Sequence, residues 1–212
     1  MKFINQKIGV FFWKLIVAFP INLQNVLANI LFSFLKNPNL KRNIFSRKNI
    51  DAAFPNLNKQ EKINLFNKNL KSMIRGIFDT GKAWFWNDSK INSLIKYEIF
   101  GLNKLIATKG NLLIFKHSHH LELDSRILGM HCELYGVERA HNSPFMQKVQ
   151  SMGRLKGLNA LADKNSPITF IKWLKKNKTV LYAIDQDYGL KNSSNIDSVS
   201  YTHLRAHETR TY

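Results

Sequence analysis

Short apolar blocks alternate with polar turns through the second half of the chain. Such blocks are typical of buried strands, and they predict strands at 97–101, 111–116, 133–139, 158–161 and 179–184. Helical periodicity predicts helices between them, at 102–108, 123–132, 144–152 and 166–177. Strands that alternate with helices are typical of sheets whose strands run largely parallel. We therefore predict an α/β fold.

Residues 8–35 are the most apolar part of the chain. Lys14 and Pro20 interrupt this run, so it predicts two amphipathic helices at 4–18 and 21–36 rather than one spanning helix. Bulky apolar side chains would enter a lipid surface and lysines would meet lipid phosphates, so we favour a membrane-embedded or membrane-surface anchor. A buried helical hairpin is the alternative.

The next region is basic and rich in turns, and it leads into a long helix. We expect one helix to end before Pro55 and another to begin at Asn58, with Glu61 completing a capping box. Apolar residues then continue at helical spacing toward Trp84, and we expect Trp84 and Trp86 to serve as packing residues or interfacial anchors. The domains expected from the whole pattern are a membrane-associated helical segment, a helical region that packs on the core, an α/β core and a tail, at 1–36, 37–96, 97–194 and 195–212.

The charge balance favours an anionic partner. Thirty-two Lys and Arg face fourteen Asp and Glu, a formal net charge of +18, while 44% hydrophobic content is ordinary for a globular protein. The lysines are scattered and no zinc-finger or RNA-recognition signature is present, so we predict no nucleic-acid partner. Cys132 is the only cysteine, which excludes an internal disulfide and fits a reducing compartment.

Candidate chemistry follows the strand at 111–116, in the segment Lys116-His117-Ser118-His119-His120-Leu121-Glu122. Ligands and catalytic groups gather at the carboxyl ends of parallel strands. We expect Glu122 to fold back onto the ring of His117, because a carboxylate that orients a histidine makes it a general base. The three histidines have no companion ligands at zinc-binding spacing, so we predict no metal and no cofactor. A polar surface loop is the alternative.

Several segments occur in the order seen in one known family. They are Asn49-Ile50-Asp51-Ala52-Ala53-Phe54-Pro55, His117 with Glu122, Asn142-Ser143-Pro144, Gly153-Arg154, Trp173-Leu174-Lys175-Lys176 and Asp185-Gln186-Asp187-Tyr188-Gly189. Together, over about residues 8–194, the chain resembles the late lipid A biosynthesis acyltransferases of the lauroyl and myristoyl type. Glycerolipid acyltransferases share the histidine–acid spacing but carry Asp at the acid position, so the other segments narrow the assignment.

The resemblance implies transfer of a fatty acyl chain from acyl carrier protein to a hydroxyl of a lipid A precursor. It implies a glycerolipid-acyltransferase-like fold, with a mixed, largely parallel sheet, at the cytoplasmic face of the bacterial inner membrane. The oligomeric state stays open at this stage, and we favour a monomer. His117 would be the general base and Glu122 would hold its ring. The candidate substrate-binding residues are Arg154, Asp185, Asp187, Arg139 and Lys116.

Arg154, Asp185 and Asp187 could each bind or position substrate, or could have a purely structural role. Arg154 would stabilise charge or bind a phosphate, because guanidinium matches phosphate geometry, or else form a salt bridge. Asp185 and Asp187 would position substrate or a neighbouring Arg, or serve only the turn after their strand. The basic excess suits three acidic partners, namely acyl carrier protein, the lipid A precursor and the anionic membrane.

Two other functions stay open at this stage. One is a glycerophospholipid-type acyltransferase, against which the 49–55 segment and the Glu at 122 argue. The other is a non-catalytic basic protein that binds membranes or nucleic acid. Past Gly189 the chain leaves the family pattern, and 195–212 resembles translated sequencing-adapter read-through, so we expect an artefactual tail and a truncated core.

Overall fold

The computed structural model describes residues 2–183 and 185, which form two compact units. The first unit consists of residues 2–25, 75–183 and 185, and the second consists of residues 26–74. Helices α2 (Ile21–Leu35) and α4 (Lys59–Phe85) contribute residues to both units. The sheet and the candidate catalytic residues that are described all belong to the first.

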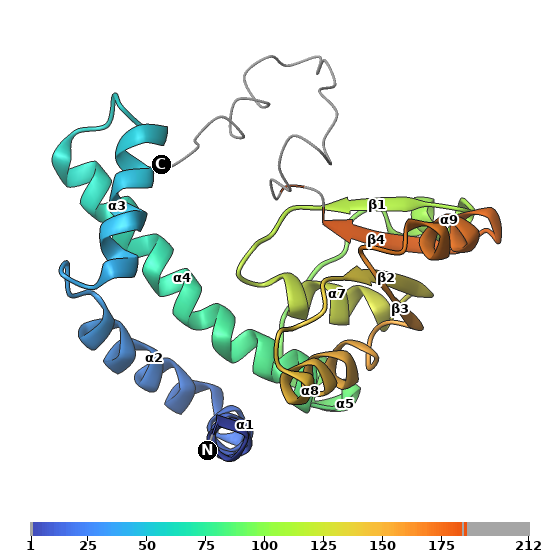
Figure 1. Cartoon of the computed structure of the whole chain (residues 1–212), viewed down its shortest axis with the longest axis horizontal. Coiled ribbons are helices and arrows are strands. Elements are labelled where there is room, and N and C mark those ends of the chain that lie inside the picture. The colour runs from blue at the N-terminus through green and yellow to red at the C-terminus, as the bar shows by residue number, and fades with distance from the viewer. Residues whose placement is uncertain (1, 184, 186–212) are drawn as a thin grey trace. The chain divides into compact units, whose positions relative to one another are not determined.

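Four strands form the sheet of the first unit. They are β1 (Leu112–Phe115), β2 (Leu134–Glu138), β3 (Ala160–Asp163) and β4 (Thr179–Ala183). Their spatial order is β1-β4-β2-β3, and each neighbouring pair is parallel (Figure 1). The central strand β4 contributes Val180 and Leu181 to the core, at 0% and 8% exposure. The predicted α/β fold with a parallel sheet is confirmed.

Helices cover both faces of this sheet. On one face, α9 (Pro167–Lys175) is held by two aromatic contacts, Trp173 with Tyr135 at 4.9 Å and Phe170 with Tyr182 at 5.5 Å between ring centroids. On the other face, Leu128 of α7 (Leu121–Gly129) packs against the buried cluster of Leu134, Leu158 and Leu181. The alternation of side chains along each strand supplies both apolar faces.

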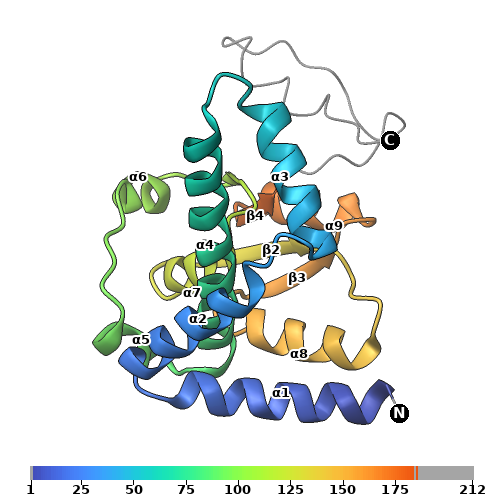
Figure 2. The ribbon, with the colours of Figure 1, turned by 90° about the vertical axis from the view of Figure 1, so that its left-hand side faces the viewer.

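A second apolar cluster lies among helices of the first unit, and α1 (Lys2–Ala18), α5 (Asp88–Leu94) and α8 (Pro144–Arg154) contribute to it. Helix α1 lies along α8 (Figure 2), and the short helix α6 (Leu102–Ala107) precedes β1. The cluster includes Trp84, Trp86 and Ile91, with Trp13 of α1 packed against it. The predicted helices around Pro20 are confirmed. Buried Gln24 caps the corner between them by donating to the carbonyl oxygens of Val17 and Phe19.

The prediction of a strand at 97–101 is wrong. Residues 95–99 have no regular structure, although Tyr97 and Ile99 pack against the second apolar cluster. The Tyr97 hydroxyl is also hydrogen-bonded to Asn92 and lies 3.0 Å from Nε2 of His131. The apolar positions of this segment are thus buried against helices rather than by pairing in the sheet.

The second unit contains α3 (Lys41–Ala53) and parts of α2 and α4. Its contacts include the Arg47 guanidinium over the Phe66 ring at 4.6 Å and an ion pair between Lys62 and Asp51. The predicted capping box is confirmed, because Asn58 Oδ1 accepts from the Glu61 amide and Glu61 accepts from the Asn58 amide. Helix α3 also ends before Pro55, as the sequence predicts.

Among the helices of the described residues, none combines the length and the apolar character that a membrane crossing requires. The outer side of α1 is nevertheless strongly apolar. Its exposed large residues are Ile4, Ile8, Phe11, Phe12 and Leu15. These positions recur at helical spacing, and they lie opposite Val10, Trp13 and Val17, which face the protein. One side of helix α1 therefore packs on the protein, and its opposite, apolar side is uncovered in this unit.

Candidate functional site

His117 and Asp185 meet at the carboxyl edge of the sheet. His117 follows β1 and Asp185 follows β4, and these two strands are parallel neighbours, so their carboxyl ends lie side by side. One carboxylate oxygen of Asp185 accepts from the His117 backbone N–H at 2.7 Å, and the other lies 2.5 Å from Nδ1 of the ring. The carboxylate therefore fixes both the backbone and the ring of His117.

This arrangement determines what the imidazole can do. A carboxylate at Nδ1 favours the tautomer that carries its proton there, which leaves the Nε2 lone pair available as a base. Within residues 2–183 and 185, no side chain hydrogen-bonds Nε2, and the His117 side chain is 35% exposed. Burial raises the pKa of the Asp185 carboxyl, but the hydrogen bonds from His117 outweigh it and hold that pKa below its ordinary value. The carboxylate is therefore ionised at neutral pH.

Glu122 lies in the first turn of α7 and is bonded to two other helices. Arg154 at the end of α8 donates to it through Nε at 3.0 Å and Nη2 at 2.5 Å, and Trp84 of α4 donates through its indole N–H at 2.9 Å. Helix α8 reaches this position because residue 153 is glycine, where a Cβ would overlap the indole of Trp84. The Glu122 carboxylate thus joins three helices.

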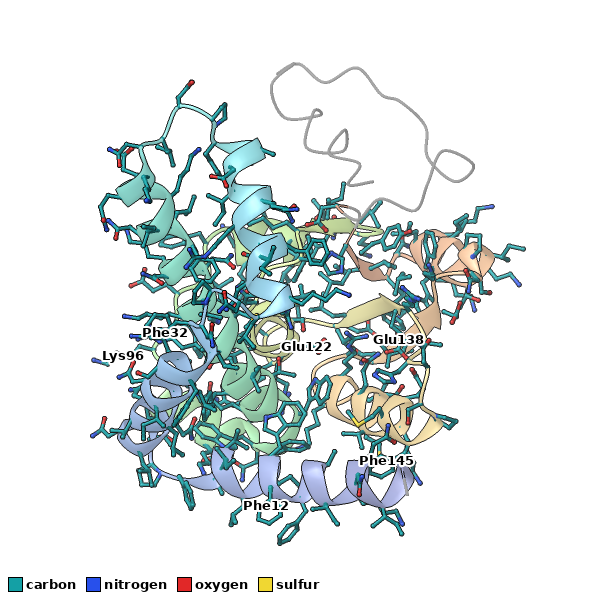
Figure 3. All side chains as sticks on the ribbon, turned by 60° about the vertical axis from the view of Figure 1, so that its left-hand side comes forward. Phe12, Phe32, Lys96, Glu122, Glu138 and Phe145 are labelled. Atoms are coloured by element: carbon teal, nitrogen blue, oxygen red, sulfur yellow. The ribbon has the colours of Figure 1, made fainter. Side chains whose placement is uncertain are left out.

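A second carboxylate completes this buried charge cluster. Nη1 of Arg154 donates to Glu138 at the end of β2, at 2.9 Å, and Figure 3 shows Glu122 and Glu138 in the same region of the unit. Gln147, Gln150 and Ser151 of α8 donate to Glu138 as well. Burial lowers the pKa of the Arg154 guanidinium, but the two glutamates outweigh it, so that pKa is raised. One buried cation is therefore shared by two carboxylates.

The carboxylate on the His117 ring differs from the one that the sequence led us to expect. Asp185 holds the ring, whereas the hydrogen bonds of Glu122 go to Arg154 and Trp84. The reason lies in where α7 begins. Leu121 is its first residue, so Glu122 projects from the first turn toward α8 and α4. For Arg154 the sequence left charge stabilisation, phosphate binding and a salt bridge open, and the structure shows ion pairs with Glu122 and Glu138.

The loop between His117 and α7 is held against α4. Nδ1 of His120 lies 2.7 Å from one carboxylate oxygen of Asp79, and Lys82 donates to the other at 2.8 Å. The His119 backbone passes so close to α4 that a Cβ on residue 76 would overlap its carbonyl oxygen, and residue 76 is glycine. Contacts at both of its ends and along its length therefore fix the loop.

The weaker candidates of the sequence analysis lie apart from these bonds. Lys116 follows β1 and Arg139 follows β2, and both side chains are exposed. Asp187 lies outside the described residues. Across the described part of the chain, no three His, Cys, Asp or Glu side chains are grouped so that they could hold a metal ion.

Sequence reasoning missed Glu138, Asp79 and the polar role of Trp84. A signal for Glu138 was present, because it shares the strand face of Leu134 and Gly136 and so puts a charge at a core position. Asp79 and Trp84 are separated from their partners by 41 and 38 residues, and no short motif joins them.

The comparisons with known proteins agree on one family. A family model described as bacterial lipid A biosynthesis acyltransferase matches residues 2–200. A lipid A biosynthesis acyltransferase of Haemophilus influenzae is 33% identical over 189 residues, which are 88% of this chain and 60% of that protein. Two Escherichia coli proteins are also similar: a palmitoleoyltransferase, 32% identical over 73% of this chain and 51% of its own length, and a lauroyltransferase, 34% identical over 69% and 48%.

The chain spans about half to three fifths of the length of these curated relatives. The family model covers all of the described residues, including His117, Glu122, Arg154 and Asp185. The chain therefore belongs to the bacterial lipid A biosynthesis acyltransferase family.

Proposed function

We propose that this protein transfers a fatty acyl chain from acyl carrier protein to a hydroxyl of a lipid A precursor. The observation that carries the proposal is the His117–Asp185 pair, whose Nε2 stands at the carboxyl edge of the sheet in a chain of this family. The net charge of +18 suits an acidic donor protein and a phosphorylated acceptor. The relatives named as acyltransferases support the same reaction class.

His117 acts as the general base of the proposed reaction. Its Nε2 takes the proton of the acceptor hydroxyl while the oxygen attacks the thioester carbonyl of the donor. The tetrahedral intermediate collapses by breaking the carbon–sulfur bond, and the imidazolium returns its proton to the departing thiolate. The ester and the free thiol are the products. Asp185 accepts from Nδ1 throughout and stabilises the imidazolium.

Glu122 and Arg154 are positioning residues in this proposal. They join the start of α7 to α4 and α8, while Asp79 holds His120 in the middle of the loop. The loop that carries His117 is thereby fixed before substrate arrives, and no binding energy is needed to order it. This role replaces both direct orientation of the ring by Glu122 and phosphate binding by Arg154.

In this proposal, helix α1 binds the protein to the membrane surface. Its uncovered face presents Phe11 and Phe12 at 63% and 54% exposure, and Figure 3 shows Phe12 on the outer side of the helix. An amphipathic helix of this kind lies in the interface with its apolar face among the acyl chains, and basic residues add attraction to anionic lipid. The proposed location is the cytoplasmic face of the bacterial inner membrane, where a lipid acceptor is reached.

The first prediction concerns the base. His117→Ala and Asp185→Asn should each lower acyl transfer by about 10²–10⁴-fold, because one removes the base and the other removes the acceptor that sets its tautomer. The assay follows radiolabelled acyl groups from acyl carrier protein to a tetra-acylated lipid A precursor. Asp163→Asn is the matched control, since Asp163 ends β3 at the same edge of the sheet, and it should keep parental activity. Full activity of His117→Ala would refute the mechanism.

The second prediction separates a positioning role of Arg154 from a phosphate-binding role. Arg154→Ala leaves two buried carboxylates without their cation, so it should lower the free energy of unfolding by about 3–5 kcal/mol in urea titrations. Lys148→Ala removes an exposed cation from the same helix and should change stability by less than about 0.5 kcal/mol. Unchanged stability of Arg154→Ala, combined with weaker use of the acceptor, would favour phosphate binding instead.

The third prediction concerns the membrane. The double variant Phe11→Ser/Phe12→Ser should bind vesicles that contain phosphatidylglycerol about tenfold more weakly than the parent, because two aromatic rings no longer enter the interface. Co-sedimentation measures the bound fraction. Ile168→Ser, which changes a residue of α9 with 65% exposure, should bind as the parent does. Equal loss in both proteins would show that α1 is not the membrane contact.

A further inference from the structure

A cavity of about 560 Å³ lies between α1, the carboxyl end of α4, α5 and α8. Its apolar walls include Val10 and Val17 of α1, Trp84 and Phe85 of α4, Trp86, and Val149 of α8. Neither His117 nor Asp185 lines it. Cavities of this size that are mostly apolar and have a few polar groups are typical of small-molecule sites.

Among the residues that the structure describes, three lysines supply the charged groups of this cavity, and no Asp or Glu lines it. Lys14 lies over the Phe85 ring at 5.2 Å and Lys90 over the Trp86 ring at 4.4 Å. Lys156 donates to the carbonyl oxygen of Trp86 at 3.2 Å. The three lysines thus all contact the aromatic wall formed by Phe85 and Trp86.

The local potential at this wall is positive. Burial lowers the pKa of the Lys156 ammonium, and the nearby cations Arg126 and Lys14 lower it further, while Asp88 opposes them. Arg126 forms an ion pair with Asp88, which offsets much of that acidic charge. An anion placed among the three lysines would therefore be attracted.

We propose that this cavity binds a single-chain lipid phosphate, with the hydrocarbon tail along the apolar wall and the phosphate among Lys14, Lys90 and Lys156. A methylene group takes up about the volume share of a water molecule, roughly 30 Å³, so the cavity has room for one long chain and not for two. Phosphate is the head group that best matches three lysines, because it carries more charge than a carboxylate.

Two features of the surroundings agree with a lipid occupant. Met152 lines the cavity at 63% exposure, so the wall reaches the surface on the α8 side. Helix α1 lines the cavity with one face and carries Phe11 and Phe12 on the opposite, exposed face. A helix placed at a lipid surface would therefore form one wall of a lipid site.

The site has a direct contact with the residues that hold the loop of His117. Trp84 forms part of the wall and donates to Glu122, and Gly153 of the wall precedes Arg154. Binding does not depend on the proposed transfer reaction, however. It is measured without turnover, so the two proposals fail separately.

Calorimetric titration of the protein with monoalkyl phosphates, kept below their micellar concentrations, tests the proposal. Each added methylene should tighten binding about fourfold until the cavity is full, and further lengthening should then have no effect. Dodecanol has the tail alone and inorganic phosphate has the head alone, and both should bind at least about tenfold more weakly than dodecyl phosphate.

Variants assign the binding to this cavity. Lys14→Gln and Lys156→Gln should each weaken dodecyl phosphate binding by several-fold while leaving dodecanol binding unchanged, and Lys148→Gln on the outside of α8 should have no effect. Ala18→Phe adds bulk at an exposed lining position and should weaken binding of every alkyl phosphate that has a long tail. Circular dichroism checks that each variant is folded.

Three results would overturn the proposal. Absence of saturable binding would show that the cavity does not hold an alkyl phosphate. Affinity that rises without limit as the tail lengthens would show partition into a general apolar surface. Equal binding by Lys14→Gln, Lys148→Gln and the parent would show that the lysines do not receive the head group.

Discussion

The parallel pairing of β1 with β4 is the constraint on which the candidate site depends. It brings together His117 and Asp185, which are 68 residues apart in the sequence, by placing the carboxyl ends of their strands side by side. Because β4 lies between β1 and β2, this pairing also fixes the centre of the sheet, where Val180 and Leu181 are buried. Apolar burial on both faces therefore stabilises the same register that sets the geometry of the proposed base.

The buried charge cluster around Arg154 has a complementary role. Two carboxylates around one guanidinium are costly to bury, and they persist here because nearly every oxygen and nitrogen of the cluster has a hydrogen-bond partner. The cluster joins α4, α7, β2 and α8. The loop of His117 begins at β1, which pairs with β4, and ends at α7, which Glu122 anchors to this cluster. Both ends are fixed by elements of the core, and this rigidity is what a general base needs if it is to act on a bound hydroxyl.

Local signals in the sequence were sufficient for most elements. Pro20 separates α1 from α2, Asn58 and Glu61 start α4, and short apolar runs mark the four strands. Strand order was not accessible in this way, because the order β1-β4-β2-β3 depends on which apolar faces pack best across the whole sheet. From the sequence we therefore predicted that the nearby Glu122, rather than the distant Asp185, contacts the His117 ring. The prediction of a strand at 97–101 is wrong for a similar reason, since the apolar residues of this segment pack on helices and the segment does not pair with the sheet.

The most direct test of this account is the nitrogen-15 NMR spectrum of the His117 ring in histidine-labelled protein, with the signal assigned by comparison with His117→Gln. The account predicts that the neutral ring carries its proton on Nδ1 and none on Nε2, in both the parent and Glu122→Gln. In Asp185→Asn this tautomer preference should be lost, because the acceptor at Nδ1 no longer carries charge. If the tautomer of the ring is unchanged in Asp185→Asn and altered in Glu122→Gln, the account is contradicted and Glu122 is the orienting carboxylate.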